Sequence, residues 1–559
     1  MEKNKKYAIS VIAIFAIIIV AGIYIINNLG KTSKQRNEEK GEKELSQLVK
    51  KIDVTEVTPQ KSAITDSQTS LAEELPDIEK YPLIVEGKGD IDVEIISSTE
   101  KSGTGVDGWL TETARKFNSQ NQKLGDKTVS ISVRSIASGL ATDYISSGKY
   151  VPDAYTPSNV LWIEMLKSNN VKTEEVTDKL VGNVAGIVIQ KSKYKNLIDK
   201  YGEANLSNVI KATLAGDITL GYTNPYASAA GLNFLISSLS YFDKDNPTSE
   251  TAVSGFKKLQ EKVPFVSYTT LQMRDSAEKG VLDAFILEYQ TFANDDSLSK
   301  DYEFIPYGVE HNNPLYTVGN VEQEKKQALQ EFVKYCTQKE ISDLAQKYGF
   351  NKYDDYNPEI KSYDGKSLYV AQDIWKDEKD LGKPVIGVFV ADISGSMSGT
   401  PLAELKNSLI NSSKYINNNN YIGLVSYNGN VYKNLEIGQF DLNQRAYFNG
   451  AVQALSASGS TSTYDAVLVA MDMINKKLKE VPDAKPMIFV LSDGETNKGN
   501  SLDKITGIVE NLQMPIYTIG YNANLKELER LSAINEAASI NADSDDVVYQ
   551  LKNLFNSNL

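Results

Sequence analysis

The stretch PVIGVFVADISGS, residues 384–396, joins an unbroken apolar run to a loop of small polar residues. An apolar run of this length without alternation is typical of a strand that is buried on both faces of a parallel sheet. Thr400 and Pro401 follow as the N-cap and first residue of a helix, predicted to extend to about residue 416. The stretch therefore predicts a strand–loop–helix unit of an α/β domain, with its polar loop at the carboxyl end of the strand.

The rest of the chain as far as residue 559 repeats this alternation of strands and helices. The Asn428-Gly429 pair predicts a hairpin, so the strand after it should run antiparallel at the edge of the sheet. We predict further strands at 422–427, 431–435, 486–491 and 516–519, and helices at 442–455, 464–478, 525–537 and 545–555. The pattern predicts a doubly wound α/β domain over residues 384–559, an ordinary size for a single domain.

Polar side chains follow two of these strands where each strand ends. Asp392, Ser394 and Ser396 come directly after the first strand, and Asp493 follows the strand at 486–491. Residues 458–463 add a loop rich in hydroxyl groups. Oxygen donors with two carboxylates suit Mg²⁺, Ca²⁺ or Mn²⁺ rather than Zn²⁺, and two carboxylates do not complete the shell of a divalent ion. We therefore predict a metal site with one position open to a ligand from outside the chain.

The order of these residues resembles the von Willebrand factor type A family and its metal-ion-dependent adhesion site. Asp392, Ser394 and Ser396 match the Asp-x-Ser-x-Ser motif of the family, and Asp493 matches its later aspartate. The resemblance implies a Rossmann-like fold and a divalent cation, Mg²⁺ first with Mn²⁺ or Ca²⁺ as alternatives, held by Asp392, Ser394, Ser396, Thr461 and Asp493. It also implies that a carboxylate of a partner completes the metal shell.

The hydroxyl loop departs from the family pattern, because it has Gly-Ser-Thr at 459–461 where Gly-Gly-Thr is usual. Thr463 therefore competes with Thr461 as the loop ligand, although Thr461 fits the spacing to Tyr464 better. Asp465 either supports the metal shell or is a charge in the first turn of a helix.

The middle of the chain also alternates strands and helices. We predict strands at 91–97, 129–133, 184–189 and 218–221, and helices at 106–117, after Ser138-Gly139 and from about Ala229. This βαβ order implies a mainly parallel sheet, whose ligands sit at the carboxyl ends of the strands and at helix N-termini. The segments PDAYTPS (152–158), 221–231, VLDAFILEYQ (281–290) and YGF (348–350) resemble the bacterial extracellular solute-binding proteins of the two-lobed periplasmic type. The resemblance implies a domain at 85–355 with a cleft that closes on a small solute.

Hydroxyl groups that follow the predicted strands are the candidates for lining this cleft. The candidate residues are Ser98, Thr99, Ser102, Thr104, Ser138, Thr156, Ser158, Asn224, Ser228 and Glu288. Hydroxyls beside helix N-termini suit an oxyanion or a polar solute, whereas Glu288 with Tyr289 in the cleft would disfavour an anion. Each serine alone could equally be an ordinary helix cap, and a domain that has lost ligand binding stays an alternative.

The first residues of the chain predict a membrane segment. Residues 1–6 carry lysines and residues 7–26 carry no charge, a length of helix that matches a bilayer core of about 30 Å. No small-x-small cleavage site follows, so we predict an uncleaved single-pass anchor in the cell membrane, with 1–6 cytoplasmic and the bulk of the chain outside the cell. Residues 27–84 are polar and charged and are predicted to be a flexible tether, and residues 356–383 a linker.

Composition limits the chemistry that remains. The chain of 559 residues has one cysteine and one histidine, so it can form neither an internal disulfide nor a cysteine- or histidine-rich zinc site. We expect Cys336 to be a buried thiol and His311 a surface imidazole. The net charge of −14 argues against nucleic acid as a partner. No general base is predicted beside the metal, so we do not expect an enzyme.

Two functions therefore stand out. The first is a cell-surface binding or adhesion protein that uses its metal to engage an acidic group on a protein or glycan. The alternative is a solute receptor or sensor, associated with transport, in which the middle domain closes on a small polar or anionic ligand. A scaffold that uses neither site is the third possibility.

Overall fold

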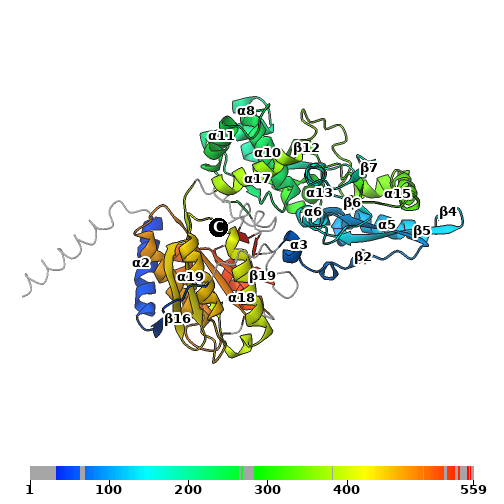
Figure 1. The fold of residues 1–559 in the computed structure, drawn as a ribbon. Coiled ribbons are helices and arrows are strands. Elements are labelled where there is room, and N and C mark those ends of the chain that lie inside the picture. Colours follow the sequence, from blue (N-terminus) through cyan, green and yellow to red (C-terminus); the bar gives the residue numbers. More distant parts are fainter. Residues whose placement is uncertain are drawn as a thin grey trace, which may run out of the picture.

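The computed structural model describes residues 33–62, 70–263, 266–267, 282–379, 382–494, 496–521, 525–535, 539–541, 551–552, 554–555 and 559 (Figure 1). The predicted cytoplasmic segment 1–6 and the anchor at 7–26 lie outside these residues, as does most of the predicted helix 545–555. Among the helices that are described, none combines the length and the apolar character needed to span a bilayer. The described strands form three sheets, one in a C-terminal domain and one in each lobe of a middle domain.

The C-terminal sheet has the predicted doubly wound α/β fold. Its strand order is β1-β16-β15-β14-β17-β18-β19. The strands are β1 (Val54–Glu56), β14 (Val385–Asp392), β15 (Tyr421–Tyr427), β16 (Val431–Gln439), β17 (Lys485–Ser492), β18 (Ile516–Gly520) and β19 (Ser539–Asn541). Strand β14 is buried at every position, because parallel neighbours β15 and β17 flank it and helices cover both faces. The apolar run at 384–391 therefore forms the centre of the sheet.

Helices cover the C-terminal sheet on both sides. One face packs against α18 (Thr400–Ser412) and α19 (Leu442–Gln453), around Phe389 and Phe448. The other face packs against α20 (Thr463–Leu478), α21 (Leu502–Leu512) and α22 (Leu525–Ala533). The predicted hairpin is confirmed, since β16 runs antiparallel to β15.

The predicted tether at 27–84 is wrong for the residues of it that are described. Ser33–Val49 form α2, which packs against α20 and α21 at the side of the C-terminal domain (α2 is labelled in Figure 1), and Val54–Glu56 form β1, which pairs in parallel with β16. The prediction that β16 forms the edge of the sheet is therefore wrong. The few apolar residues of α2 cannot build a core alone, but Leu45 is 1% exposed because the C-terminal domain supplies the rest of the core.

The middle domain has two lobes. Lobe 1 has the strand order β2-β5-β3-β6-β13-β7. Its strands are β2 (Leu83–Val85), β3 (Ile91–Ser97), β5 (Lys127–Ser135), β6 (Ala154–Thr156), β7 (Thr173–Thr177) and β13 (Leu315–Val318), with β4 (Lys123–Leu124) beside β5. Its helices include α4 (Thr99–Ser102), α5 (Trp109–Ser119), α6 (Ser138–Ser147), α7 (Leu161–Ser168), α15 (Gln323–Cys336) and α16 (Lys339–Lys347). Cys336 is buried in this lobe, as expected.

Lobe 2 has the strand order β10-β9-β11-β8-β12. Its strands are β8 (Val184–Gln190), β9 (Leu220–Thr223), β10 (Val266–Ser267), β11 (Ala284–Glu288) and β12 (Tyr302–Glu310). Its helices include α8 (Lys191–Tyr201), α9 (Leu206–Ala215), α10 (Ala229–Phe242), α11 (Glu250–Gln260), α13 (Tyr289–Ala293) and α14 (Asp296–Asp301). The chain passes from one lobe to the other between β7 and β8 and returns between β12 and β13, which gives the two lobes paired connections.

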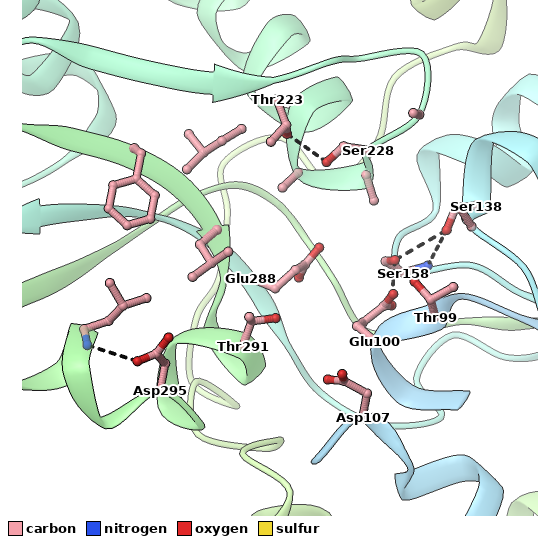
Figure 2. Close-up of a pocket in the computed structure, with 18 residues that line it drawn as sticks. Thr99, Glu100, Asp107, Ser138, Ser158, Thr223, Ser228, Glu288, Thr291 and Asp295 are labelled. Carbon is pink, nitrogen blue, oxygen red and sulfur yellow. Dashed lines mark hydrogen bonds between the residues drawn. The ribbon is translucent and has the colours of Figure 1, made fainter. Parts of the chain in front are cut away.

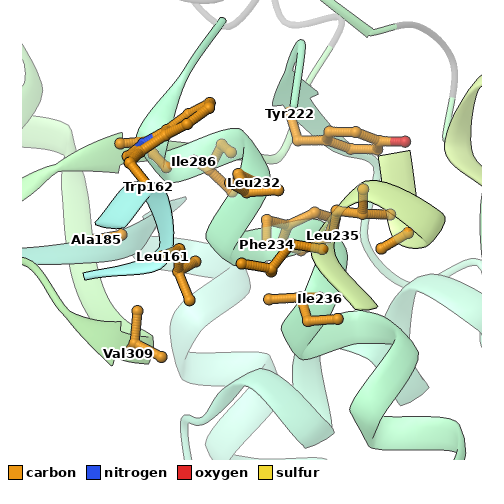
Figure 3. Close-up of a cluster of buried hydrophobic side chains, with 14 of the residues drawn as sticks. Leu161, Trp162, Ala185, Tyr222, Leu232, Phe234, Leu235, Ile236, Ile286 and Val309 are labelled. Atoms are coloured by element: carbon orange, nitrogen blue, oxygen red, sulfur yellow. The ribbon is translucent and has the colours of Figure 1, made fainter. Parts of the chain in front are cut away.

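The predicted linker at 356–383 is wrong in its central part, which forms α17 (Gly365–Glu378). This helix packs against α7 of lobe 1 and α10 of lobe 2, and Trp375 is fully buried in the cluster shown in part in Figure 3. The Trp375 indole donates to the hydroxyl of Tyr222 at 2.8 Å. A polar segment with widely spaced apolar residues therefore completes the core of the middle domain.

Candidate functional sites

The carboxyl ends of β14 and β17 meet at one edge of the C-terminal sheet. Asp392 is the last residue of β14, and its Oδ1 accepts a hydrogen bond from the Ser394 N–H at 2.8 Å. Its Oδ2 accepts from the Ser492 hydroxyl at 2.7 Å and from the Tyr427 hydroxyl at 3.2 Å. Burial raises the pKa of Asp392, and the bonds from Ser492 and Ser394 work in the opposite direction.

The two serines of the motif lie beside this carboxylate. The hydroxyl oxygens of Ser394 and Ser396 are 3.0 Å apart, with Ser394 buried and Ser396 exposed. Backbone bonds from Gly395 N to Gly459 O at 2.9 Å and from Ser458 N to Ile393 O at 2.8 Å join the motif to the hydroxyl loop. The sheet edge therefore presents one buried and one accessible hydroxyl next to a buried aspartate.

Asp493 and the hydroxyl loop complete the edge. The Oδ1 of Asp493 is buried and has no hydrogen-bond partner among the residues that the structure describes, and the charge of Asp493 is close enough to Asp392 to raise the pKa of Asp392. The Thr461 N–H donates to Asn497 Oδ1 at 2.9 Å, whereas the Thr463 hydroxyl accepts from Thr496 at 2.8 Å. Asp392 thus ends β14, Ser394 and Ser396 follow it, Asp493 follows β17, and Thr461 lies on the loop that is hydrogen-bonded to the motif.

Asp465 does more than place a charge in the first turn of α20. Its Oδ1 accepts from the N–H of Asn500 at 3.0 Å and from the Asn500 side-chain amide at 2.5 Å. A Cβ added at Gly499, whose φ is +84°, would lie 2.4 Å from Asp465 Oδ2. Asp465 therefore positions the loop that precedes α21, and this loop in turn bonds Thr461.

A second site lies between the two lobes of the middle domain, where side chains from both lobes surround a cavity of about 410 Å³ (Figure 2). Cavities of this size are typical of small-ligand sites. Lobe 1 contributes polar side chains from α4, the turn before α5, the start of α6 and the loop after β6, and lobe 2 from β9, α10, β11 and α13. The polar lining consists of Thr99, Glu100, Asp107, Ser138, Ser158, Thr223, Ser228, Glu288, Thr291 and Asp295.

Half of the predicted cleft residues line this cavity, namely Thr99, Ser138, Ser158, Ser228 and Glu288. The others, Ser98, Ser102, Thr104, Thr156 and Asn224, do not. Their polar groups mostly serve local structure: Ser102 donates to the Ser98 carbonyl at 2.8 Å, and Thr156 donates to the Asn313 carbonyl at 3.2 Å. Asn224 Oδ1 accepts from the Tyr226 N–H at 2.9 Å, and Thr104 is exposed outside the cavity.

Sequence reasoning missed Glu100, Asp107, Thr223, Thr291 and Asp295. Glu100 lies inside the turn at 97–105, in which only the residues with hydroxyl groups were predicted to line the cleft. Its Oε1 accepts from the Ser158 hydroxyl at 2.7 Å, which joins α4 to the loop after β6. The acidic residues in these turns are the sequence feature from which the negative charge of the cavity could have been predicted.

Lys101 lies behind Glu100 and is fully buried. Its Nζ donates to the Thr156 carbonyl at 2.9 Å and to Ser98, and lies 3.8 Å from Glu100 Oε1. Burial lowers the pKa of Lys101 to about 8. Burial also works to raise the pKa of Glu100, but Lys101 and the hydroxyls of Ser98 and Ser158 outweigh it, so that pKa is lowered.

Glu288 is the carboxylate at the end of β11. His311 Nδ1 lies 2.7 Å from its Oε1, and Asn183 donates to its Oε2 at 3.0 Å. Burial raises the pKa of Glu288, and His311 opposes that change. The prediction of a surface imidazole was wrong: His311 is fully buried where β12 leads back to lobe 1.

The chain thus consists of two α/β modules, and comparison with known proteins identifies the family of each. A family model for the von Willebrand factor type A domain matches residues 388–556, and one for the bacterial extracellular solute-binding protein matches residues 102–351. The chain therefore carries a von Willebrand factor type A domain after a solute-binding domain.

Curated relatives match about three tenths of this chain. The inter-alpha-trypsin inhibitor heavy chain H3 of Bos taurus is 32% identical over 181 residues, which cover 29% of this chain and 20% of the relative. The Homo sapiens protein is 30% identical over 182 residues, with the same coverage. The match thus spans about a fifth of the length of these relatives.

Solved structures resemble each module. The sulfate-binding protein SubI from Mycobacterium tuberculosis H37Rv is 15% identical, covers 50% of this chain and 96% of its own, and has a TM-score of 0.36. A von Willebrand factor type A structure from Catenulispora acidiphila is 18% identical, covers 31% of this chain and 42% of its own, and has a TM-score of 0.28.

Proposed function

We propose that this chain is a membrane-anchored binding protein on the outer surface of the cell, and not an enzyme. Its von Willebrand factor type A domain would hold a divalent cation and use it to engage an acidic group on a protein or glycan. The observation that carries this proposal is the buried, unpartnered Oδ1 of Asp493 at the sheet edge that also bears Asp392, Ser394 and Ser396.

The donor set fits a hard divalent cation. A buried carboxylate oxygen without a partner costs free energy, and a cation beside it would offset that cost. Asp493, Ser394, Ser396 and Thr461 offer oxygen donors, and Asp392, held by Ser492 and Tyr427, adds the second negative charge. Among the residues that the structure describes, no three His, Cys, Asp or Glu side chains converge on one point, so hydroxyls would have to supply part of the shell. When bound, the cation would supply an electrostatic attraction for a carboxylate.

The anchor at 7–26 supports the location, because it would leave both modules on one side of the membrane. The absence of a catalytic role rests on the chemistry of the edge. Asp392 is held by hydrogen bonds and Asp493 would be occupied by the metal, and the histidine of the chain lies in the other module.

A calorimetric titration of the purified full-length chain with Mg²⁺ and Mn²⁺ tests the metal. Binding should be saturable in the wild type and in Asp503→Asn, a control whose side chain is 86% exposed. Asp493→Asn should lose at least tenfold in affinity, because the amide removes the charge and keeps the shape. Equal affinity in Asp493→Asn and wild type would sink the metal assignment.

The partner is tested separately by capture from cell-surface extracts. Proteins or glycans retained by the wild-type chain in Mg²⁺ should be released by EDTA and should not be retained by Asp493→Asn. Retention that is changed neither by EDTA nor by Asp493→Asn would contradict a metal-mediated contact.

A second function is favoured by the cavity between the lobes. Both lobes contribute polar side chains to it, and paired connections join the lobes, as a domain that closes on a solute requires. We propose that the middle domain is a solute receptor whose ligand sits between Glu100 and Ser138 of lobe 1 and Ser228 and Glu288 of lobe 2. A thermal-shift screen of the full-length chain against small anions, sugars, amino acids and amines tests it; a flat response to all four classes would count against a receptor.

A further inference from the structure

The polar wall of the cavity is dominated by negative charge. Glu100, Asp107, Glu288 and Asp295 line it, and none of the described lining residues is lysine, arginine or histidine. Figure 2 shows these carboxylates on two sides of the same space, Glu100 and Asp107 from lobe 1 and Glu288 and Asp295 from lobe 2. Hydroxyl groups alone would suit an anion or a neutral solute, but this arrangement repels an anion.

The hydrogen bonds around His311 direct its Nδ1 toward the carboxylate of Glu288. The Oδ1 atoms of Asn159 and Asn233 accept from the backbone N–H groups of Leu161 and Val309, so the Nδ2 groups of both asparagines must donate. Each Nδ2 lies 3.0 Å from His311 Nε2, which therefore accepts and carries no proton. The imidazole is then the neutral tautomer with its proton on Nδ1, and that proton is donated to Glu288.

The nearby cation does not cancel the charge. Lys101 is buried behind Glu100 and balances that carboxylate, and the neutral His311 adds no charge. Asp107 accepts a bond from the Gln290 amide at 3.2 Å, a neutral donor. Asp107 on lobe 1 and Glu288 on lobe 2 therefore keep the cavity negative from both sides.

The shape of the cavity argues against a bare metal ion. Its lining also includes apolar side chains, Phe285, Ile286 and Leu287 of β11 and Leu298 of α14. The acidic side chains do not converge on a point, since no metal-holding group of three is found among the described residues. Separate carboxylates in a lining that also holds apolar side chains suit a ligand with charged ends and an apolar body.

We propose that the cleft binds a small organic cation, with primary ammonium groups on an aliphatic skeleton. One ammonium group would pair with Glu288 and another with Asp107, so that the ligand joins the two lobes. This inference rests on the receptor function proposed for the middle domain and names its ligand class. Of the ligands expected from the sequence, an oxyanion or a polar solute, it excludes the oxyanion, as Glu288 in the cleft already suggested.

Calorimetry on the full-length chain tests the ligand class with putrescine and spermidine as probes. The matched neutral control is 1,4-butanediol, which has the length of putrescine without its charge, and sulfate and molybdate are the anionic controls. The amines should bind and the controls should not. Glu288→Gln should weaken putrescine binding at least tenfold, whereas Glu331→Gln, on the exposed side of α15, should not change it.

The possible results separate this inference from the receptor function. Binding of sulfate or molybdate without binding of the amines would overturn the cation and leave a solute receptor. Equal binding of putrescine and butanediol would also overturn it, because charge would then play no part. No binding by any probe would count against the cation, and only a flat response in the wider screen would remove the receptor as well.

A pH titration keeps the test valid if Glu288→Gln does not fold. Burial raises the pKa of both Glu288 and Asp107, so they take up protons at a higher pH than ordinary carboxylates. The other charged groups facing them are Glu100, Lys101 and Asp295, and protonation of any of these also disfavours a cation. Putrescine stays fully charged, so its affinity for the wild type should fall several-fold from pH 7.5 to pH 5.5, and constant affinity would overturn the inference.

Discussion

Thr461 and Thr463 lie two residues apart in the hydroxyl loop but make different contacts. Thr461 is held through its backbone, because its N–H donates to Asn497 and its carbonyl accepts from the Lys498 N–H at 2.9 Å. Thr463 is held through its side chain, whose hydroxyl accepts from Thr496, and it is the first residue of α20. The backbone bonds position the Thr461 hydroxyl without using it, which favours Thr461 as the metal ligand.

Replacing each hydroxyl by a methyl group of the same shape separates these two threonines. Thr461→Val should lower the affinity for Mg²⁺ at least tenfold while leaving the fold intact. Thr463→Val should keep the affinity within about twofold and lower the free energy of unfolding by about 1 kcal/mol, the usual net worth of one hydrogen bond. Calorimetry and chemical denaturation measure the two effects; the opposite order of affinities would make Thr463 the ligand.

The sequence indicated the candidate metal residues more completely than the residues that line the cavity. The candidate metal residues Asp392, Ser394, Ser396 and Asp493 could be named because they stand at or just after the ends of strands that are visible as apolar runs, such as 384–391. Thr461 lies in a loop before α20 and was placed by the family motif alone. The cavity residues could not be named in this way, since Glu100 and Lys101 are neighbours on one short helix and only Glu100 faces the cavity. A single turn of helix carries no periodicity that would show which side chain faces the ligand.

At the scale of elements, α2 and β1 belong to the C-terminal domain, although the whole middle domain separates them from β14 in the sequence. Leu45 packs into the same core cluster as Val467 and Val509 of α20 and α21. A Cβ added at Gly41 would lie 3.0 Å from Leu512 Cγ, so the two helices approach closely at this glycine. Sequence patterns did not predict this docking, because its apolar partners lie far away in the chain.

Truncating Leu45 tests the docking of α2. Leu45→Ala should lower the free energy of unfolding of the C-terminal domain by about 2–5 kcal/mol, because it leaves a cavity in a closed core. Gln47→Ala, on the exposed side of the same helix, should change it by less than about 0.5 kcal/mol. Thermal and denaturant unfolding of the full-length chain measure both; similar small effects would mean that α2 is not docked in solution.

At the scale of the whole molecule, the solute-binding domain is an insertion into the von Willebrand factor type A domain. The C-terminal domain takes α2 and β1 from one side of the insertion and β14 to the C-terminus from the other. Contacts between the modules include Glu74 with Lys414 and Tyr415, and Lys376 Nζ with the Tyr415 carbonyl at 2.9 Å. The segment after β1 also contacts α19, because the Ser62 N–H donates to the Ala446 carbonyl at 3.0 Å.

This insertion can be tested by removing it. A chain that joins residues 33–62 to 382–559 through a long Gly/Ser linker should fold and should keep the affinity of the full-length chain for Mg²⁺. Residues 384–559 alone should unfold at a lower temperature, by about 5 °C or more, because β16 becomes an unpaired edge and the surface under Leu45 is exposed. Both chains contain every predicted metal residue, so a difference in melting temperature reports the contribution of α2 and β1. Equal melting temperatures would show that the von Willebrand factor type A domain is complete without its N-terminal segment.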